Sequence, residues 1–222
     1  MLSLLIESYY VIFKTFILTH VIYGRYFKRI FKTEDVLLDT MKVLAINGSP
    51  RNNGSTAKAI SLVAEKLGNA DVEVVDLGKM RISHCVACMR CKTEGKCAID
   101  DDMTSLYAKI RESEMILLAS PIYFGMETGL FKNFLDRMYA MGPAGQRKAD
   151  VGKLCKGSII LTCGAPTGDM IYGGVSAHLM AALKYFGITD LSSMIIPGAK
   201  PEGIQDSQHF SEYIEALEFQ LK

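Results

Sequence analysis

The sequence of 222 residues has almost no net charge, with 25 lysines and arginines against 24 aspartates and glutamates. A nucleic-acid-binding domain needs a basic surface, so this balance gives no support for nucleic acid as a partner. Repeats and low-complexity segments are absent. Six cysteines among 49% hydrophobic residues do not fit a secreted disulfide scaffold, which is small and poor in long apolar runs. We therefore expect one globular domain in the reducing cytoplasm.

A long apolar run is also missing, even from the hydrophobic first forty residues. The longest uncharged stretch there runs from Thr15 to Gly24, about half of the roughly 20 residues that a membrane-spanning helix needs. The small-residue cleavage site of a signal peptide is absent as well. Because Met41 directly precedes a strong strand pattern, we interpret residues 1–40 as an N-terminal extension, either not native or membrane-associated. The domain itself is expected at 41–222.

From Met41 onward, short apolar runs alternate with segments of helical character. The runs predict five strands, over 42–47, 72–76, 115–120, 157–162 and 191–196. The segments that follow them predict five helices, near 55–67, 102–111, 128–138, 175–186 and 207–221. The strand runs are almost continuously apolar, as in a parallel sheet that is covered on both faces. We predict an α/β fold of three layers, doubly wound around a five-stranded parallel sheet, with its ligand beyond the carboxyl ends of the strands.

The loop after the first strand lacks both common nucleotide-binding glycine motifs, GxGxxG and GxxxxGK[ST]. It reads NGSPRNNGST, residues 47–56, and leads directly into a helix whose N-terminus favours an anion. Three hydroxyls and one guanidinium add donors, at Ser49, Arg51, Ser55 and Thr56. Such a cradle suits a phosphate monoester such as FMN better than a triphosphate with Mg²⁺. The alternative is an ordinary turn in which Ser55 caps the helix.

The loop after the third strand, SPIYFG, combines proline, aromatic residues and glycine. Pro121 fixes the backbone and turns the chain out of the strand. Tyr123 and Phe124 offer aromatic surface to a flat heterocycle, and Gly125 permits close backbone approach. The alternative is that the two aromatic rings only pack at the edge of the sheet.

Four of the six cysteines lie within HCVACMRCKTEGKC, residues 84–97, while Cys155 and Cys163 lie outside it and are expected to be structural. The four are spaced C-x₂-C-x₂-C-x₅-C, at Cys85, Cys88, Cys91 and Cys97. The first three match the ligand spacing of bacterial ferredoxins, so the pattern favours one [4Fe–4S] cluster. A zinc site, reactive or disulfide-forming thiols, and cysteines without metal are the alternatives.

Charged residues near these motifs are interpreted as structural. Asp100, Asp101 and Asp102 precede a predicted helix, where carboxylates complement the helix dipole and cap its N–H groups. Lys132 and Asp136 are four residues apart on a later helix, which predicts an ion pair. Arg137, next to them, is likewise expected to have a structural role.

MKVLAINGSPRNNGST together with SPIYFGMETGLFKNFLDR, residues 120–137, resembles the flavodoxin-like NADPH-dependent FMN reductase superfamily. The resemblance extends from Met41 to the last helix. It implies that the FMN phosphate contacts the first loop, at Ser49, Arg51, Ser55 and Thr56. It implies that the flavin ring lies against the second loop and a wall after the fourth strand, at Pro121, Ile122, Tyr123, Phe124, Gly125 and Gly164.

The cysteine stretch lies between the second strand and the next helix, a placement that resembles the iron–sulfur flavoprotein family of that superfamily. The resemblance implies FMN and a [4Fe–4S] cluster in a homodimer or homotetramer. Electrons would pass from ferredoxin through cluster and flavin to small acceptors such as quinones or oxygen species, with no catalytic side chain required because the cofactors carry the chemistry. Two alternatives remain: a clusterless NAD(P)H-dependent FMN or quinone reductase, and a non-enzymatic redox-sensing flavoprotein.

Overall fold

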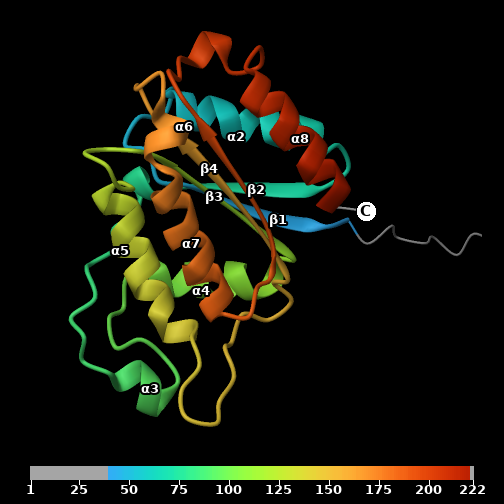
Figure 1. Cartoon of the computed structure of the whole chain (residues 1–222). Coiled ribbons are helices and arrows are strands. Elements are labelled where there is room, and N and C mark those ends of the chain that lie inside the picture. The colour runs from blue at the N-terminus through green and yellow to red at the C-terminus, as the bar shows by residue number, and fades with distance from the viewer. Residues whose placement is uncertain (1–39, 221–222) are drawn as a thin grey trace, which may run out of the picture. The chain divides into compact units, whose positions relative to one another are not determined.

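The computed structural model describes residues 40–220, so the predictions for residues 1–39 lie outside the described part. Five strands form one parallel sheet in the order β2-β1-β3-β4-β5 (Figure 1). They are β1 (Lys42–Asn47), β2 (Asp71–Asp76), β3 (Met115–Pro121), β4 (Lys156–Thr162) and β5 (Asp190–Ile196). From β1 the chain adds β2 on one side and then β3, β4 and β5 on the other, as in flavodoxin-like folds. Ligands bind at the switch point between β1 and β3.

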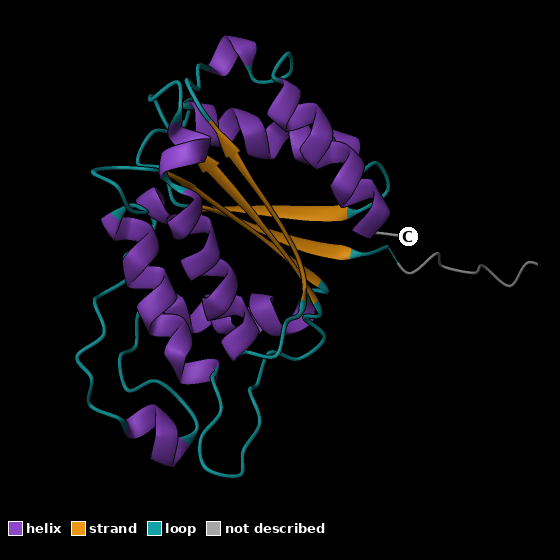
Figure 2. Cartoon of the chain, viewed as in Figure 1, coloured by secondary structure: helices purple, strands orange, loops and turns teal. Residues whose placement is uncertain are grey.

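Helices cover both faces of the sheet, so that the strands lie between two helical layers (Figure 2). One layer contains α2 (Ser55–Lys66) and α8 (Gln208–Gln220). The other contains α4 (Met103–Glu112), α5 (Gly129–Met138) and α7 (Gly173–Tyr185). The shorter elements are α3 (Arg90–Glu94), α6 (Gly168–Ile171) and 3₁₀ helices at Leu77–Lys79, Tyr139–Met141 and Pro201–Gly203.

The inner strand β1 shows why a strand covered on both faces is continuously apolar. Leu44 and Ile46 pack into the core beneath α4, α5 and α7, whereas Val43 and Ala45 pack into the core beneath α2 and α8. Side chains alternate across a strand, so a strand with both faces covered needs apolar residues at every position. The predicted three-layer fold and its five-stranded parallel sheet are confirmed.

The five predicted strands and the five predicted long helices all appear, with ends shifted by at most two residues. Helices α3 and α6 were not predicted, because segments of five and four residues are too short to show a helical period. None of the residues of α3 is buried, so apolar patterning could not have located it. Among residues 40–220, every helix is too short or too polar to cross a membrane.

Candidate functional site

A small pocket of about 170 Å³ opens where the loops after β1, β3 and β4 meet at the carboxyl end of the sheet. We call it the strand-end pocket. Most residues predicted to contact FMN line it: Ser49, Arg51, Ser55, Thr56, Pro121, Ile122, Tyr123 and Gly164. The fold therefore brings together segments separated by more than 100 positions in the chain, at the switch point where a doubly wound fold binds its ligand.

The loop after β1 is held by its own side chains. The Asn47 side chain accepts a hydrogen bond from the Ser49 N–H at 3.0 Å and donates one to Asp76 at 2.9 Å. The Ser49 hydroxyl accepts from the Arg51 N–H at 3.1 Å and donates to the Arg51 carbonyl at 3.3 Å. These short-range bonds fix the backbone of the loop, while the Arg51 side chain extends from it into an exposed position.

Helix α2 begins at the wall of this pocket. Gly54 is the N-cap residue and no side chain caps the helix, so the alternative in which Ser55 is the cap is wrong. The Ser55 hydroxyl instead donates to the Ala199 carbonyl at 3.1 Å, and the hydroxyls of Thr56 and Thr162 share a hydrogen bond of 2.8 Å. The first N–H groups of a helix have no intrahelical acceptor. Here they belong to residues that line the pocket, where an anion would be favoured.

The SPIYFG loop forms a tight hairpin turn. Tyr123 and Met126 exchange two backbone hydrogen bonds, of 2.8 and 3.2 Å, around Phe124 and Gly125. Both turn residues have positive φ angles, 50° and 89°, which glycine adopts without strain and phenylalanine does not. Phe124 is fully exposed at the tip, so neither it nor Gly125 lines the pocket. Gly125 is explained by its turn conformation, and contact of these two residues with a flavin ring stays a prediction.

Several residues of this pocket were not predicted from the sequence. Gly54, Thr162, Cys163 and Ala199 also line it. Thr162 ends β4, so its position at the carboxyl end of a predicted strand was a usable signal. Cys163 is buried, and burial raises the pKa of its thiol, in keeping with the structural role expected for it.

The four clustered cysteines line a second, larger cavity of about 650 Å³. Its other walls are largely apolar and aromatic, with Tyr139, Tyr185 and Phe186 beside the cysteine loop, which we define as residues 84–98. Burial raises the pKa of the Cys91 thiol, the adjacent Lys92 ammonium opposes this, and the other three thiols raise it further. The ionisation of Cys91 is therefore sensitive to the other three thiols.

The donor set of this cavity fits an iron–sulfur cluster in its chemistry. All four thiols are free, and four thiolates are the usual ligands of a [4Fe–4S] cluster. Among residues 40–220, however, no three metal-ligating side chains have the spacing of a metal site. The cysteines thus share one cavity without forming a finished coordination geometry.

Two cations, one in a distant segment and one within the loop, hold the cysteine loop in place. Arg147 donates to the carbonyls of Cys91 at 3.1 Å and Gly95 at 3.4 Å. Lys92, inside the loop, donates to the Tyr139 carbonyl at 2.7 Å and lies 3.6 Å from the centre of the Tyr139 ring, a cation–π contact. In Figure 1, α3 lies beyond the end of α5, next to the extended segment that follows α5.

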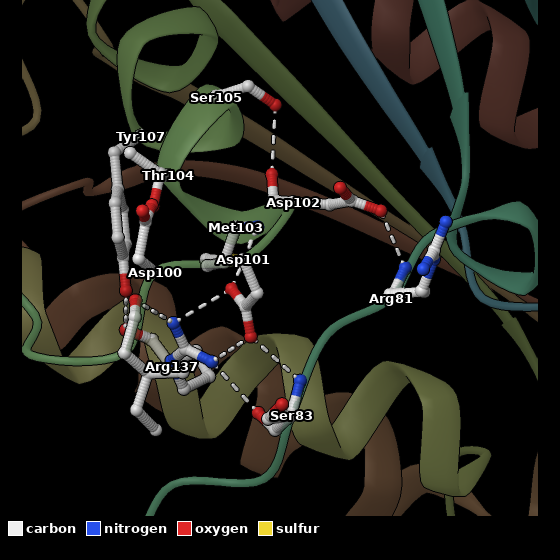
Figure 3. A network of polar contacts seen from close by, with 11 residues as sticks. Arg81, Ser83, Asp100, Asp101, Asp102, Met103, Thr104, Ser105, Tyr107 and Arg137 are labelled. Carbon is white, nitrogen blue, oxygen red and sulfur yellow. Dashed lines mark hydrogen bonds and ion pairs between the residues drawn. The ribbon is translucent and has the colours of Figure 1, made fainter.

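Two of the three consecutive aspartates bind the segment that leads into the cysteine loop (Figure 3). Asp101 accepts from the Met103 N–H at 3.1 Å, as a cap would, but also from the Ser83 N–H at 2.9 Å. Asp102 is the N-cap residue of α4, yet its carboxylate accepts from the Arg81 N–H at 2.7 Å and makes no capping bond. The interpretation as caps is therefore only partly right, since two of the carboxylates bind the backbone that precedes the cysteines.

Helix α5 connects the two cavities. Its N-cap Thr128 accepts from the Phe131 N–H at 3.1 Å and donates to the Gly48 carbonyl at 2.6 Å, which ties the helix to the loop after β1. Farther along, Lys132 and Asp136 line the cysteine cavity and form the predicted ion pair. One helix therefore begins beside the strand-end pocket and continues along the cysteine cavity.

The family model described as NADPH-dependent FMN reductase matches residues 41–199. The chain belongs to this family. An iron-sulfur flavoprotein of Archaeoglobus fulgidus is 32% identical over 186 residues, covering 80% of this chain and 81% of that protein. An iron-sulfur flavoprotein of Methanocaldococcus jannaschii is 35% identical over 116 residues, covering 50% of this chain and 59% of that protein. These relatives place this FMN reductase family member among the iron–sulfur flavoproteins.

Solved structures agree on the fold of this family member. An NAD(P)H:quinone oxidoreductase from Methanothermobacter marburgensis superposes with a TM-score of 0.64 at 14% identity, covering 80% of this chain and 95% of that chain. An FMN-dependent NADH-azoreductase from Bacillus anthracis, solved in complex with FMN, gives a TM-score of 0.57 at 17% identity, covering 82% and 100%. The family and fold make this protein a flavin-dependent oxidoreductase.

Proposed function

We propose that this oxidoreductase binds FMN in the strand-end pocket and a [4Fe–4S] cluster on Cys85, Cys88, Cys91 and Cys97. It would transfer electrons from ferredoxin or NAD(P)H to a small acceptor such as a quinone or an oxygen species. The observation that carries this proposal is that all four clustered cysteines line one cavity, along the same helix that begins at the strand-end pocket. We further propose a cytoplasmic homodimer or homotetramer in which residues 1–40 are not required.

The residues of the strand-end pocket fit a flavin phosphate. Arg51 would supply the positive charge, and the N-terminus of α2 would supply N–H donors and the positive end of the helix dipole. The hydroxyls of Ser49 and Ser55 already donate to backbone carbonyls, so they would turn to donate to a phosphate. Tyr123 and Gly164 line the same pocket and would bound the flavin ring.

Bound FMN supplies electron exchange in steps of one or two, and an iron–sulfur cluster supplies single-electron exchange. The chain's own contribution would be to orient the two cofactors and to exclude water from them. The largely apolar walls of the cysteine cavity, including Tyr185 and Phe186, would exclude part of the solvent from a bound cluster, although Cys85 and Cys88 are themselves exposed. Exclusion of solvent and the surrounding hydrogen bonds are the means by which a protein sets a cluster's potential.

A clusterless NAD(P)H-dependent reductase is the second candidate. It is favoured by the lack of a finished metal geometry among residues 40–220 and by the likeness in fold to an NAD(P)H:quinone oxidoreductase. In this case the cysteines would be structural, or would act as thiols in a redox-sensing flavoprotein.

Absorption spectroscopy combined with iron, zinc and sulfide analysis of the anaerobically purified full chain tests these alternatives. We expect an oxidised flavin spectrum with about four irons and four sulfides per chain. Flavin without iron would contradict the cluster and favour the hydride-driven reductase. Stoichiometric zinc would assign the cysteines to a structural site, and a protein without flavin would overturn both candidates.

A further inference from the structure

A single buried arginine joins the two ends of the cysteine loop. Arg137 lies on α5, and its side chain is 0% exposed. One terminal nitrogen donates to the Ser83 carbonyl at 2.9 Å, and the other donates to the Ile99 carbonyl at 3.1 Å (Figure 3). Ser83 and Ile99 are the residues immediately before and after the loop at 84–98. The guanidinium therefore closes the neck of the loop.

The same guanidinium is paired with a carboxylate. Asp101 accepts hydrogen bonds from both terminal nitrogens of Arg137, at 2.7 and 3.0 Å. Because Asp101 also binds the Ser83 N–H, Ser83 is held through both its N–H and its carbonyl. The Tyr107 hydroxyl donates to the Arg137 carbonyl at 2.9 Å and fixes the helix backbone. Burying a charge is costly unless it is paired and hydrogen-bonded, and this network meets both conditions.

One donor of Arg137 remains. Its Nε–H is buried and has no hydrogen-bond partner among the described residues. Cys97 is two residues before Ile99, to which the guanidinium is bonded. Burial by itself lowers the pKa of Arg137, but the hydrogen bonds to Asp101 outweigh it, and the nearby Tyr107 and Cys97 side chains raise the pKa further. The arginine therefore binds the backbone two residues from Cys97.

We propose that Arg137 is the positioning residue of the cluster site. It closes the neck of the cysteine loop, and it places a positive charge at the Ile99 carbonyl, two residues from Cys97. The proposal deepens the function proposed above and rests on it. A positive charge favours the more negative, reduced form of a cluster, so Arg137 raises the reduction potential of the site.

The test compares Arg137→Lys, Arg137→Gln and a matched pair, Arg111→Lys and Arg111→Gln, in anaerobically purified full chain. Arg111 is a suitable control because it also forms an arginine–aspartate ion pair, with Asp150, but is partly exposed and does not touch the cysteine loop. The readouts are the iron-to-FMN ratio and the cluster midpoint potential from an EPR-monitored titration. Cleavage at Arg90, Lys92 and Lys96 by trypsin reports opening of the loop independently of any cluster.

We expect both Arg137 variants to lose at least half of their iron, while FMN content is unchanged. The cluster that remains should have a lower potential in Arg137→Gln and a potential near that of the wild type in Arg137→Lys, which keeps the charge. Trypsin should cut the loop at least tenfold faster in both variants, and the Arg111 variants should match the wild type. If Arg137→Gln does not fold, Arg137→Lys still tests the neck, because lysine cannot bridge two carbonyls and a carboxylate in a planar fork.

The outcomes separate this inference from the proposed function. Wild-type iron content and potential in Arg137→Lys and Arg137→Gln would overturn the inference and leave the cluster standing. A wild-type protein with FMN but no iron would overturn the cluster and with it the role of Arg137 in the cluster site. In a protein without iron, trypsin cleavage alone tests whether Arg137 closes the neck of the cysteine loop. Equal cleavage rates in the wild type and the Arg137 variants would overturn that role too.

Discussion

The strand-end pocket and the cysteine cavity are built in opposite ways. The loop after β1 is shaped from within by hydrogen bonds between residues two positions apart, Asn47 with Ser49 and Ser49 with Arg51, and longer-range bonds such as that from Thr128 to Gly48 add to them. The cysteine loop is held mainly from outside, by Arg137 and Arg147, which reach its backbone from 38 to 56 residues away.

This difference has a physical cause. A loop between a buried strand and a buried helix has both ends fixed by the core, so short-range bonds are enough to shape it. The cysteine loop leaves the core, and its helix α3 contains no buried residue. Its shape therefore depends on a few charged side chains that bind backbone carbonyls, and it should be sensitive to single substitutions that the pocket would tolerate.

The largest expected effect is on the cysteine cavity alone. Replacing Cys91 with serine should remove most of the iron and leave FMN binding unchanged, because serine is a poor ligand for a cluster and the strand-end pocket is separate. Iron and flavin analysis of the anaerobically purified variant measures both. Cys155→Ser is the matched control, since Cys155 is an exposed free cysteine outside the loop. Full iron in Cys91→Ser would contradict the ligand assignment.

The converse substitution affects the strand-end pocket alone. Arg51→Gln should raise the dissociation constant for FMN about 10- to 100-fold, because a charge-assisted hydrogen bond contributes about 1.5–3 kcal/mol. Fluorescence titration of flavin into the apoprotein measures the change, and the effect should shrink at high salt. Lys66→Gln, at the far end of α2, removes the same charge and should leave affinity unchanged. An unaltered affinity in Arg51→Gln would place the phosphate elsewhere.

A smaller effect, on the free energy of unfolding, is expected where Thr128 of α5 binds the loop after β1. Thr128→Val removes the hydroxyl that caps α5 and binds the Gly48 carbonyl, so the free energy of unfolding should fall by about 1–2 kcal/mol. Urea denaturation measures it. Thr128→Ser keeps the hydroxyl and should recover most of the stability. Equal losses in the two variants would contradict the role of the hydroxyl, because Thr128→Ser keeps the hydroxyl and loses only the methyl group.

The smallest effect is expected on the free energy of unfolding when the pH is lowered. Burial would raise the pKa of Asp101, but hydrogen bonds from Arg137 and from the N–H groups of Ser83 and Met103 outweigh burial and lower it. The ionised carboxylate therefore stabilises the fold at pH values above the unfolded pKa of about 4, and this contribution is lost as the pH falls through the lower folded pKa.

Urea denaturation between pH 7 and pH 3 measures this loss of stability. Asp101→Asn should abolish the part of the acid dependence that belongs to the neck of the cysteine loop. Asp150→Asn, which alters the exposed pair with Arg111, should keep that part. An acid dependence unchanged in Asp101→Asn would show that other carboxylates cause it.

Much of this molecule could be predicted from local sequence. Short apolar runs located all five strands, and the runs are continuous in β1, β3 and β4, whose two faces are both covered. The glycine- and hydroxyl-rich loop after the first strand could be assigned to the ligand end of the sheet, because every parallel strand presents its carboxyl end there. Cysteine spacing likewise predicted that four thiols would be used together, and they line one cavity.

Contacts between distant segments were decided only by the tertiary structure. The pairing of Thr56 with Thr162 depends on which strands are neighbours, and the pairing of Arg137 with Asp101 depends on how α5 packs beside α4. The exposed position of Phe124 at the tip of a two-residue turn was likewise not evident from the sequence, and its contact with a flavin ring stays a prediction. Periodicity and spacing report on residues that are near in sequence, whereas the neck of the cysteine loop arises from packing between elements, on which local patterns carry no information.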